Sequence, residues 1–214
     1  MTQRQPAIFF AHGSPMIAIE TNRYTRAWDA LGERLARPQA VLFVSAHWYT
    51  RGTAVTAMEH PRTIHDFGGF PRELYEIAYP APGSLELAAR VRELARPVNV
   101  GMDTAWGLDH GTWTVMMHVF PKADVPIVQL SIDGTQPPAF HYELGRRLAP
   151  LRDEGVLIAA SGNVVHNLYV MQRANAAPFD WASRFETTTK SLAASGDVAR
   201  LVDYTSLGAD AEQS

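Results

Sequence analysis

Three short apolar runs, each soon followed by a histidine, are the feature that most limits how this chain can fold. The runs and their histidines are Val41–Val44 with His47, Ile8–Ala11 with His12, and Val156–Ala160 with His166. Short runs of this kind, rich in β-branched residues, are typical of buried strands in an α/β sheet. If the strands are parallel, their carboxyl ends share one edge, where such sheets bind ligands. The sequence therefore predicts that three imidazoles gather at one edge of one sheet.

Segments with apolar residues at helical spacing alternate with the predicted strands along the chain. We predict strands at 7–11, 41–45, 53–58, 98–100, 127–132 and 156–160, and helices at 24–35, 84–94, 115–120, 140–151 and 181–194. This alternation is typical of an α/β fold with a largely parallel central sheet and helices on both of its faces. The first strand, helix and second strand form a β-α-β unit, which predicts a parallel pair. No repeat or linker interrupts the pattern, so we expect a single domain over residues 1–214.

Composition excludes several classes of function. The net charge is −3 and the sequence pI is about 6.2, so the chain lacks the basic surplus of nucleic-acid-binding proteins. There is no cysteine, which excludes disulfides, thiolate metal sites and cysteine nucleophiles. Any metal must therefore be held by nitrogen and oxygen ligands, for which eight histidines are available. No apolar run approaches the roughly 20 residues of a membrane span, and the N-terminus lacks a signal-peptide pattern, so we expect a cytoplasmic protein.

His12 and His47 are the first candidate metal ligands, because each follows a predicted strand. Neutral imidazole is a good ligand for Fe(II), Zn(II) and Mn(II). One such histidine alone more often bonds to a loop carbonyl, but two at matching strand ends favour a shared metal ion. His166 follows a strand and a glycine turn, which places it over the same edge as a third ligand or a general base. Its structural alternative is a capping role in the first turn of a helix.

Two further histidines lie in glycine-rich segments. His110 stands between Asp109 and a glycine, where other backbone or a substrate can approach closely. Asp109 either orients an imidazole or caps the following helix, and spacing alone favours neither. His65 and Asp66 lie in the long aromatic loop at 60–83, which is either a functional flap or a packed surface loop. We interpret these two residues as a packing pair unless the loop covers the site.

Aromatic residues and serines near these segments complete the candidate set. Several rings could wall an aromatic substrate, although core packing accounts equally well for any one of them: Trp48, Phe67, Phe70 and Trp113. Ser14 and Ser161 lie in turns that follow strands. Neither belongs to a G-x-S-x-G elbow, so the sequence disfavours a serine hydrolase.

Seven segments carry a resemblance to a known family, in order over most of the chain: Ala11–Pro15, Ser45–Trp48, Thr63–Pro71, Tyr79–Gly83, Asp109–Gly111, Val128–Ile132 and Ala160–Asn167. Together they resemble the class III extradiol ring-cleavage dioxygenases, the LigB-like superfamily. The resemblance is nearest to the branch of bacterial DOPA extradiol dioxygenases. It implies an enzyme that opens the aromatic ring of a catechol, such as DOPA, with O₂.

The resemblance also implies roles for four histidines. His12 and His47 match the family's metal ligands, and His110 matches an acid/base residue near the substrate. His166 matches a residue that lines the metal centre as the catalytic base, or as a further ligand in zinc-bound forms. The implied cofactor for activity is non-haem Fe(II). Zn(II) is redox-inert, so it would be a substitute metal in the isolated protein.

One motif of the family has no counterpart in this sequence. The family places another metal ligand close to its C-terminus, and no matching segment precedes Ser214. We therefore expect that a C-terminal segment is missing from the catalytic domain at 1–214. Two rival functions follow from the same residues: a zinc-dependent hydrolase that activates water, or a non-catalytic binding protein of the LigB-like fold.

Overall fold

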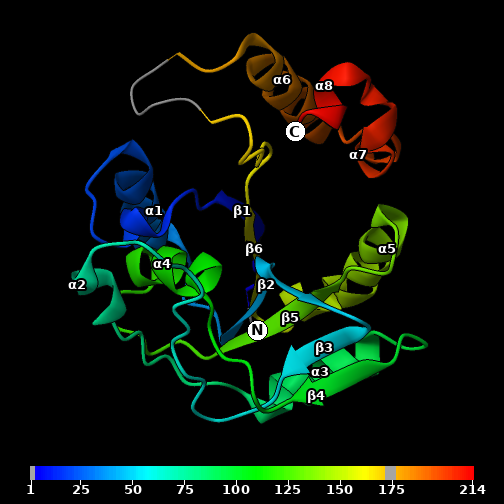
Figure 1. Ribbon diagram of the computed structural model, residues 1–214. Helices are drawn as coiled ribbons and strands as arrows, with labels where there is room; N and C mark the ends of the chain where they lie inside the picture. Colours follow the sequence, from blue (N-terminus) through cyan, green and yellow to red (C-terminus); the bar gives the residue numbers. More distant parts are fainter. Residues whose placement is uncertain (1–2, 172–176) are drawn as a thin grey trace. The chain divides into compact units, whose positions relative to one another are not determined.

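Figure 1 shows the protein as a computed structural model that describes residues 3–171 and 177–214. The strands are β1 (Ala7–Ala11), β2 (Ala40–Thr50), β3 (Thr53–Thr56), β4 (Val100–Asp103), β5 (Ile127–Asp133) and β6 (Val156–Gly162). The α-helices are α1 (Arg23–Arg34), α2 (Arg72–Tyr75), α3 (Leu85–Leu94), α4 (His110–Val119), α5 (Pro138–Leu148), α6 (Asp180–Ser195), α7 (Val198–Val202) and α8 (Ala209–Glu212). Three short 3₁₀ turns are η1 (Pro15–Ala18), η2 (Ala149–Arg152) and η3 (Tyr204–Leu207). Within the described residues, no helix is long and apolar enough to cross a bilayer.

Six strands of the described chain form one sheet in the order β1-β6-β2-β5-β3-β4. Neighbouring strands are parallel except β3 and β5, which meet antiparallel at the single register pair Val55 and Leu130. The prediction of an α/β fold with a largely parallel sheet is therefore confirmed. The predicted pairing of the first two strands is wrong, because β6 lies between β1 and β2 and pairs with both. The last strand in the sequence, β6, thus lies between the two strands of the opening β-α-β unit.

Helices cover both faces of the sheet, as predicted. On one face α1 and α4 pack together, and Val41 and Phe43 of β2 join Trp113 of α4 in the main core. Successive strand residues point to opposite faces. Leu42 is fully buried outside this core, and α3 packs against β3 and β4. Each large apolar side chain buried in this way contributes about 1.5–3 kcal/mol.

Several predicted elements differ from the structure in their bounds. The strand predicted at 41–45 is β2, which continues to Thr50, so His47 lies within the strand and not after it. The strand predicted at 98–100 is β4, which begins only at Val100. The helix predicted at 115–120 is α4, and it begins earlier, at His110. The earlier start has a local cause, because the Asp109 side chain accepts a hydrogen bond from the backbone N–H of Thr112 and so caps the helix. The histidine thereby becomes a helical residue rather than part of a loop.

The chain divides into two compact units, Met1–Gln136 with Glu143–Gly162, and Pro137–Tyr142 with Asn163–Ser214. The first unit holds the whole sheet. The second holds α6, α7 and α8, and its α6 confirms the helix predicted at 181–194. Phe185 and Leu192 of α6 are buried, and Arg184 forms an ion pair with Asp210 of α8 at 2.7 Å. The extent of one catalytic domain over 1–214 stays a prediction.

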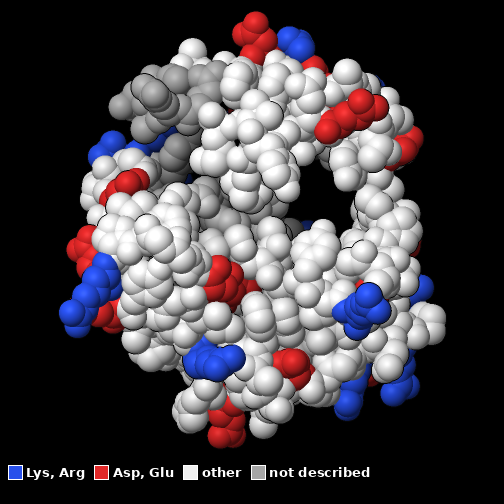
Figure 2. Space-filling model, in the orientation of Figure 1, with Lys and Arg blue, Asp and Glu red and all other residues white. Residues whose placement is uncertain are grey.

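Charged side chains are dispersed over the surface. On the face drawn in Figure 2, acidic and basic residues are interspersed, and no large patch of one sign is visible. This agrees with the small net charge of −3. A surface of this kind provides no broad electrostatic field for a polyanion.

Helices α1 and α4 approach so closely that Gly32 has no room for a side chain. A Cβ atom at Gly32 would overlap the carbonyl oxygen of Val119 in α4. We expect Gly32→Ala to lower the free energy of unfolding by about 1–3 kcal/mol, because the helices must separate. The matched control is Gly145→Ala in α5, where a Cβ atom meets nothing within 4 Å. That change should stabilise the protein by about 0.5–1 kcal/mol, as Ala replaces Gly in a helix. Urea denaturation of both variants would test this, and equal effects would contradict it.

Candidate metal centre

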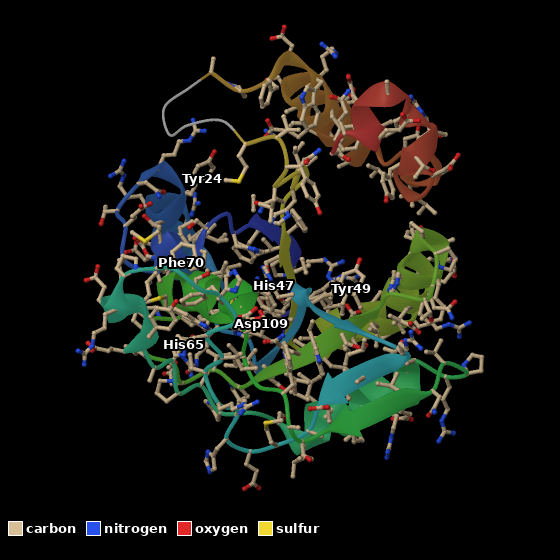
Figure 3. The ribbon with its side chains drawn as sticks, viewed as in Figure 1. Tyr24, His47, Tyr49, His65, Phe70 and Asp109 are labelled. Atoms are coloured by element: carbon tan, nitrogen blue, oxygen red, sulfur yellow. The ribbon has the colours of Figure 1, made fainter. Side chains whose placement is uncertain are left out.

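The sheet and α4 bring three of the candidate histidines to one edge. His12 follows β1 directly, and His47 lies late in β2, within a stretch where the register against β5 shifts between Val44 and Tyr49. His110 is the first residue of α4, a helix that packs against β2 and β6. Figure 3 shows His47 beside Asp109, the residue that caps α4. Parallel strands therefore position two of these residues, and a helix start positions the third.

The three imidazoles form a compact cluster. One nitrogen of each ring lies within 4.8 Å of the others. Nε2 of His12 and Nε2 of His47 are 2.9 Å apart, and the ring centroids of His47 and His110 are 3.9 Å apart. His12 and His110 are buried, whereas His47 is partly exposed, so solvent reaches the cluster at His47.

The cluster fits a divalent metal ion. Two imidazole nitrogens that bind one ion at about 2.0–2.1 Å and at roughly a right angle lie about 3 Å apart. The Nε2 atoms of His12 and His47 are separated by 2.9 Å, which matches that geometry. Without a cation, two ring nitrogens at this distance require that one of them donate a hydrogen to the other. Imidazole nitrogen suits both Fe(II) and Zn(II).

A buried carboxylate supports the cluster from the core side. Asp109 is fully buried and accepts hydrogen bonds from Ser45 Oγ at 2.6 Å and Gln129 Nε2 at 2.8 Å. Burial raises the pKa of Asp109, although these two donors oppose the shift. Ser45 Oγ also accepts the backbone N–H of His47 at 3.2 Å. Of the two roles considered for Asp109, helix capping is thus observed, and the carboxylate reaches the backbone of His47 through Ser45.

Gly111 lets the first turn of α4 approach the strand ends. A Cβ atom at Gly111 would lie 2.5 Å from Ser45 Oγ, 2.9 Å from His47 Cδ2 and 3.0 Å from Ser161 Oγ. Ser161 Oγ donates a hydrogen bond to the carbonyl oxygen of Gly111 at 2.7 Å. Any side chain at this position would therefore displace the imidazole of His47 or push α4 away. Ser161 serves in packing here, in line with its rejection as a nucleophile.

The loop at 60–83 brings Asp66 to the histidine cluster. Asp66 Oδ1 accepts the backbone N–H of His110 at 2.9 Å and also lies 2.9 Å from Nδ1 of that residue. Oδ2 of Asp66 lies 3.7 Å from Nδ1 of His47. Burial pushes the pKa of Asp66 up, but its contacts with His110 outweigh this and leave the pKa below its usual value. His65, in contrast, bonds through Nε2 to the carbonyl oxygen of Ile77 at 3.0 Å.

The four aromatic candidates fall into two groups. Phe67 contacts the cluster, since its ring meets that of His110 edge to face with centroids 5.5 Å apart. Phe70 packs on Phe67 at 5.4 Å, and both rings are partly exposed. Trp48 and Trp113 are buried and belong to the packing of the protein. Phe67 and Phe70 therefore remain as candidates for a substrate wall.

His166 belongs to the second compact unit. Its side chain is exposed, and residues 163–171 form bends and turns without a helix. The alternative of a capping role in a first helical turn is therefore not observed. The same segment is tied down by Asn167, whose Nδ2 donates to the carbonyl oxygen of Gln213 at 2.8 Å. The role of His166 as base or ligand stays a prediction.

Comparison with known proteins decides the family. Residues 6–213 match the family model described as the catalytic LigB subunit of aromatic ring-opening dioxygenase. The chain belongs to the LigB family. The predicted resemblance is therefore confirmed, and with it the assignment of the chain to a family of ring-opening dioxygenases.

Individual LigB relatives agree with the family match. A protein of Escherichia coli (strain K12) named 4,5-DOPA dioxygenase extradiol is 56% identical over 190 residues, which cover 88% of this chain and 70% of the relative. A protein of the same name from Beta vulgaris is 37% identical over 202 residues, covering 92% and 75% of the two chains. The crystal structure of an uncharacterized Escherichia coli K12 protein has a TM-score of 0.76 and 50% identity, and the match covers 88% of this chain and 72% of that one.

Gly111→Ala should damage the metal site of this LigB protein. The new methyl group would collide with His47 and Ser45, so we expect about 10–100-fold weaker metal binding. Gly145→Ala is the matched control, because it makes the same change in a helix with open space around it. Zinc affinity measured by competition with a chromophoric chelator would test the prediction. Unchanged affinity in Gly111→Ala would show that the close approach of α4 does not hold His47.

Proposed function

We propose that this chain is a metal-dependent extradiol dioxygenase that opens the ring of a DOPA-like catechol with O₂. The cluster of His12, His47 and His110 carries the proposal, because catechol cleavage needs a metal centre held by few protein ligands. The names of the Escherichia coli and Beta vulgaris relatives support DOPA as the substrate class. The partners are therefore a small catechol and dioxygen.

His12 and His47 are the proposed metal ligands, and Fe(II) is the proposed cofactor for activity. Iron held there would supply the electron transfer between catecholate and dioxygen, which redox-inert Zn(II) cannot supply. Burial of His12 excludes water from one side of the position, and the partly exposed His47 leaves an approach for substrate. Protein that carries zinc should bind a catechol without opening it.

His166 and His110 are the proposed groups for proton transfer. A catechol chelates a cation as its catecholate, so a base must first remove a hydroxyl proton. We assign this step to His166 and the later proton donation to the leaving oxygen to His110. The carboxylate of Asp66 lies 2.9 Å from Nδ1 of His110. A carboxylate at that nitrogen stabilises the imidazolium that a general acid requires.

The reaction balances without a further oxidant. The ring bond beside the diol breaks, both atoms of dioxygen enter the product, and dioxygen is reduced as the ring is oxidised. Phe67 lies against His110 and Phe70 packs on Phe67, and these two partly exposed rings provide an apolar wall for the ring of the substrate. Such a wall limits water at the reacting atoms, which strengthens the electrostatic effect of the imidazoles.

Oxygen consumption tests the proposed activity. We expect protein reconstituted anaerobically with Fe(II) to consume oxygen with DOPA, and to yield a product heavier than the substrate by two oxygen atoms. Caffeate and protocatechuate would define the range of catechols. The zinc-loaded protein is the control and should consume none. Absence of uptake with every catechol, from a full-length protein, would reject the dioxygenase, and turnover of esters by the zinc form would favour a hydrolase.

Single His→Ala changes test the assigned roles. His12→Ala and His47→Ala should lose stoichiometric metal, because each removes a ligand. His110→Ala and His166→Ala should keep more metal and lose about 10²–10⁴-fold in kcat, the usual value of a general acid or base. Metal analysis and steady-state kinetics on the same preparations separate the two groups. Metal loss confined to the second pair would reverse the assignment.

A further inference from the structure

Asp66 lies between two of the imidazoles, and the proposed function uses only its contact with His110. Its Oδ1 accepts the backbone N–H of His110 and lies 2.9 Å from Nδ1 of the same residue. Its Oδ2 lies 3.7 Å from Nδ1 of His47. The Nδ1 contact of His110 is short but not aligned as a hydrogen bond, which is common for catalytic groups before substrate binds. One carboxylate therefore faces the Nδ1 atoms of both rings.

Backbone hydrogen bonds fix this arrangement. Ile64 donates to the carbonyl oxygen of Leu108 at 2.7 Å, and Leu108 donates to that of Arg62 at 2.8 Å. Trp113 of α4 also donates through Nε1 to the carbonyl oxygen of Ile64 at 2.9 Å. These bonds clamp the chain just before Asp66 against the chain just before His110. The carboxylate is thus held in place by the fold and does not depend on a mobile loop.

The position of a carboxylate decides which ring nitrogen carries the hydrogen. A neutral imidazole has one N–H and one lone pair, and its tautomer follows the partner of each nitrogen. An ionised carboxylate only accepts hydrogen bonds, so it repels a lone pair and attracts an N–H. Nδ1–H is therefore the favoured form of both His47 and His110. Each ring is left with its lone pair on Nε2, and in His47 this is the atom that lies 2.9 Å from Nε2 of His12.

We infer that Asp66 is a positioning residue that fixes the Nδ1–H tautomers of His47 and His110 together, so that Nε2 of His47 is available to the metal position and Nε2 of His110 is left to take up and return a proton. One side chain then sets two rings that come from a strand and from a helix. The part of His110 in proton transfer rests on the proposed function. The consequences for tautomer and for metal affinity do not, because both are properties of the binding site alone.

Asp66→Asn separates this role from simple packing. The amide oxygen can still accept the backbone N–H of His110, so we expect the variant to fold. The amide nitrogen, however, only donates. With the amide oxygen at the Oδ1 position, the amide nitrogen takes the place of Oδ2 and faces Nδ1 of His47. An Nδ1–H of His47 would then meet another donor, so this ring is expected to carry its hydrogen on Nε2, where it opposes a cation. We expect one imidazole of the metal-free variant to change tautomer, seen by long-range ¹H–¹⁵N correlation spectroscopy, and Zn(II) affinity to fall about 10–100-fold.

Asp29→Asn is the matched control. Asp29 of α1 makes a comparable contact, 3.0 Å from Nδ1 of His118 in α4. The same chemical change there should leave the spectra of His47 and His110 and the Zn(II) affinity at their wild-type values. If Asp66→Asn keeps Nδ1–H on both rings and binds Zn(II) as wild type does, the inference is wrong. If the wild type opens no catechol, the proposed function fails, while the spectra and the affinity still decide the role of Asp66.

Discussion

The approach of the first turn of α4 to the carboxyl ends of β2 and β6 is the contact on which the rest of this site depends. It places His110 beside His47, and it exists because Gly111 has no side chain to hold the helix off Ser45 and Ser161. The contact also removes polar groups from water, and each one left unpaired would cost about 1–3 kcal/mol. The Ser161 hydroxyl meets that requirement by bonding to the Gly111 carbonyl. The geometry of the cluster therefore follows from the way the first turn of α4 packs against the edge of the sheet.

Asp109 shows how the same groups serve folding and function. A buried carboxylate is costly unless several donors surround it. Here they come from three elements: Ser45 of β2, Gln129 of β5 and the backbone of Thr112 in α4. Ser45 Oγ also accepts the backbone N–H of His47, so the same network holds that residue in place. The cap of α4 and the position of a proposed ligand thus share one hydrogen-bond network, and neither can be changed without the other.

The parts of this fold that sequence analysis could find are those set by local patterns. The runs before His12 and His47 predict their strands, and parallel strands place both residues at one edge. The position of β6 between β1 and β2 depends on contacts between distant parts of the chain, which no local pattern predicts. The start of α4 at His110 could not be predicted, because the sequence fits two roles for Asp109 equally well: a helix cap, and a residue that orients an imidazole. Asp66 was missed because its role arises from a clamp between two loops, which brings it to His110 from 44 positions away in the chain.

The sheet edge and the loop make different contributions to the centre. Strand and helix backbones determine where the imidazoles lie, but the hydrogen on each ring is free to occupy either nitrogen, and backbone geometry does not choose between them. A negative charge on the far side of the rings makes that choice. The core thus sets where the proposed ligands lie, and Asp66, in the loop at 60–83, sets which ring nitrogen carries the lone pair.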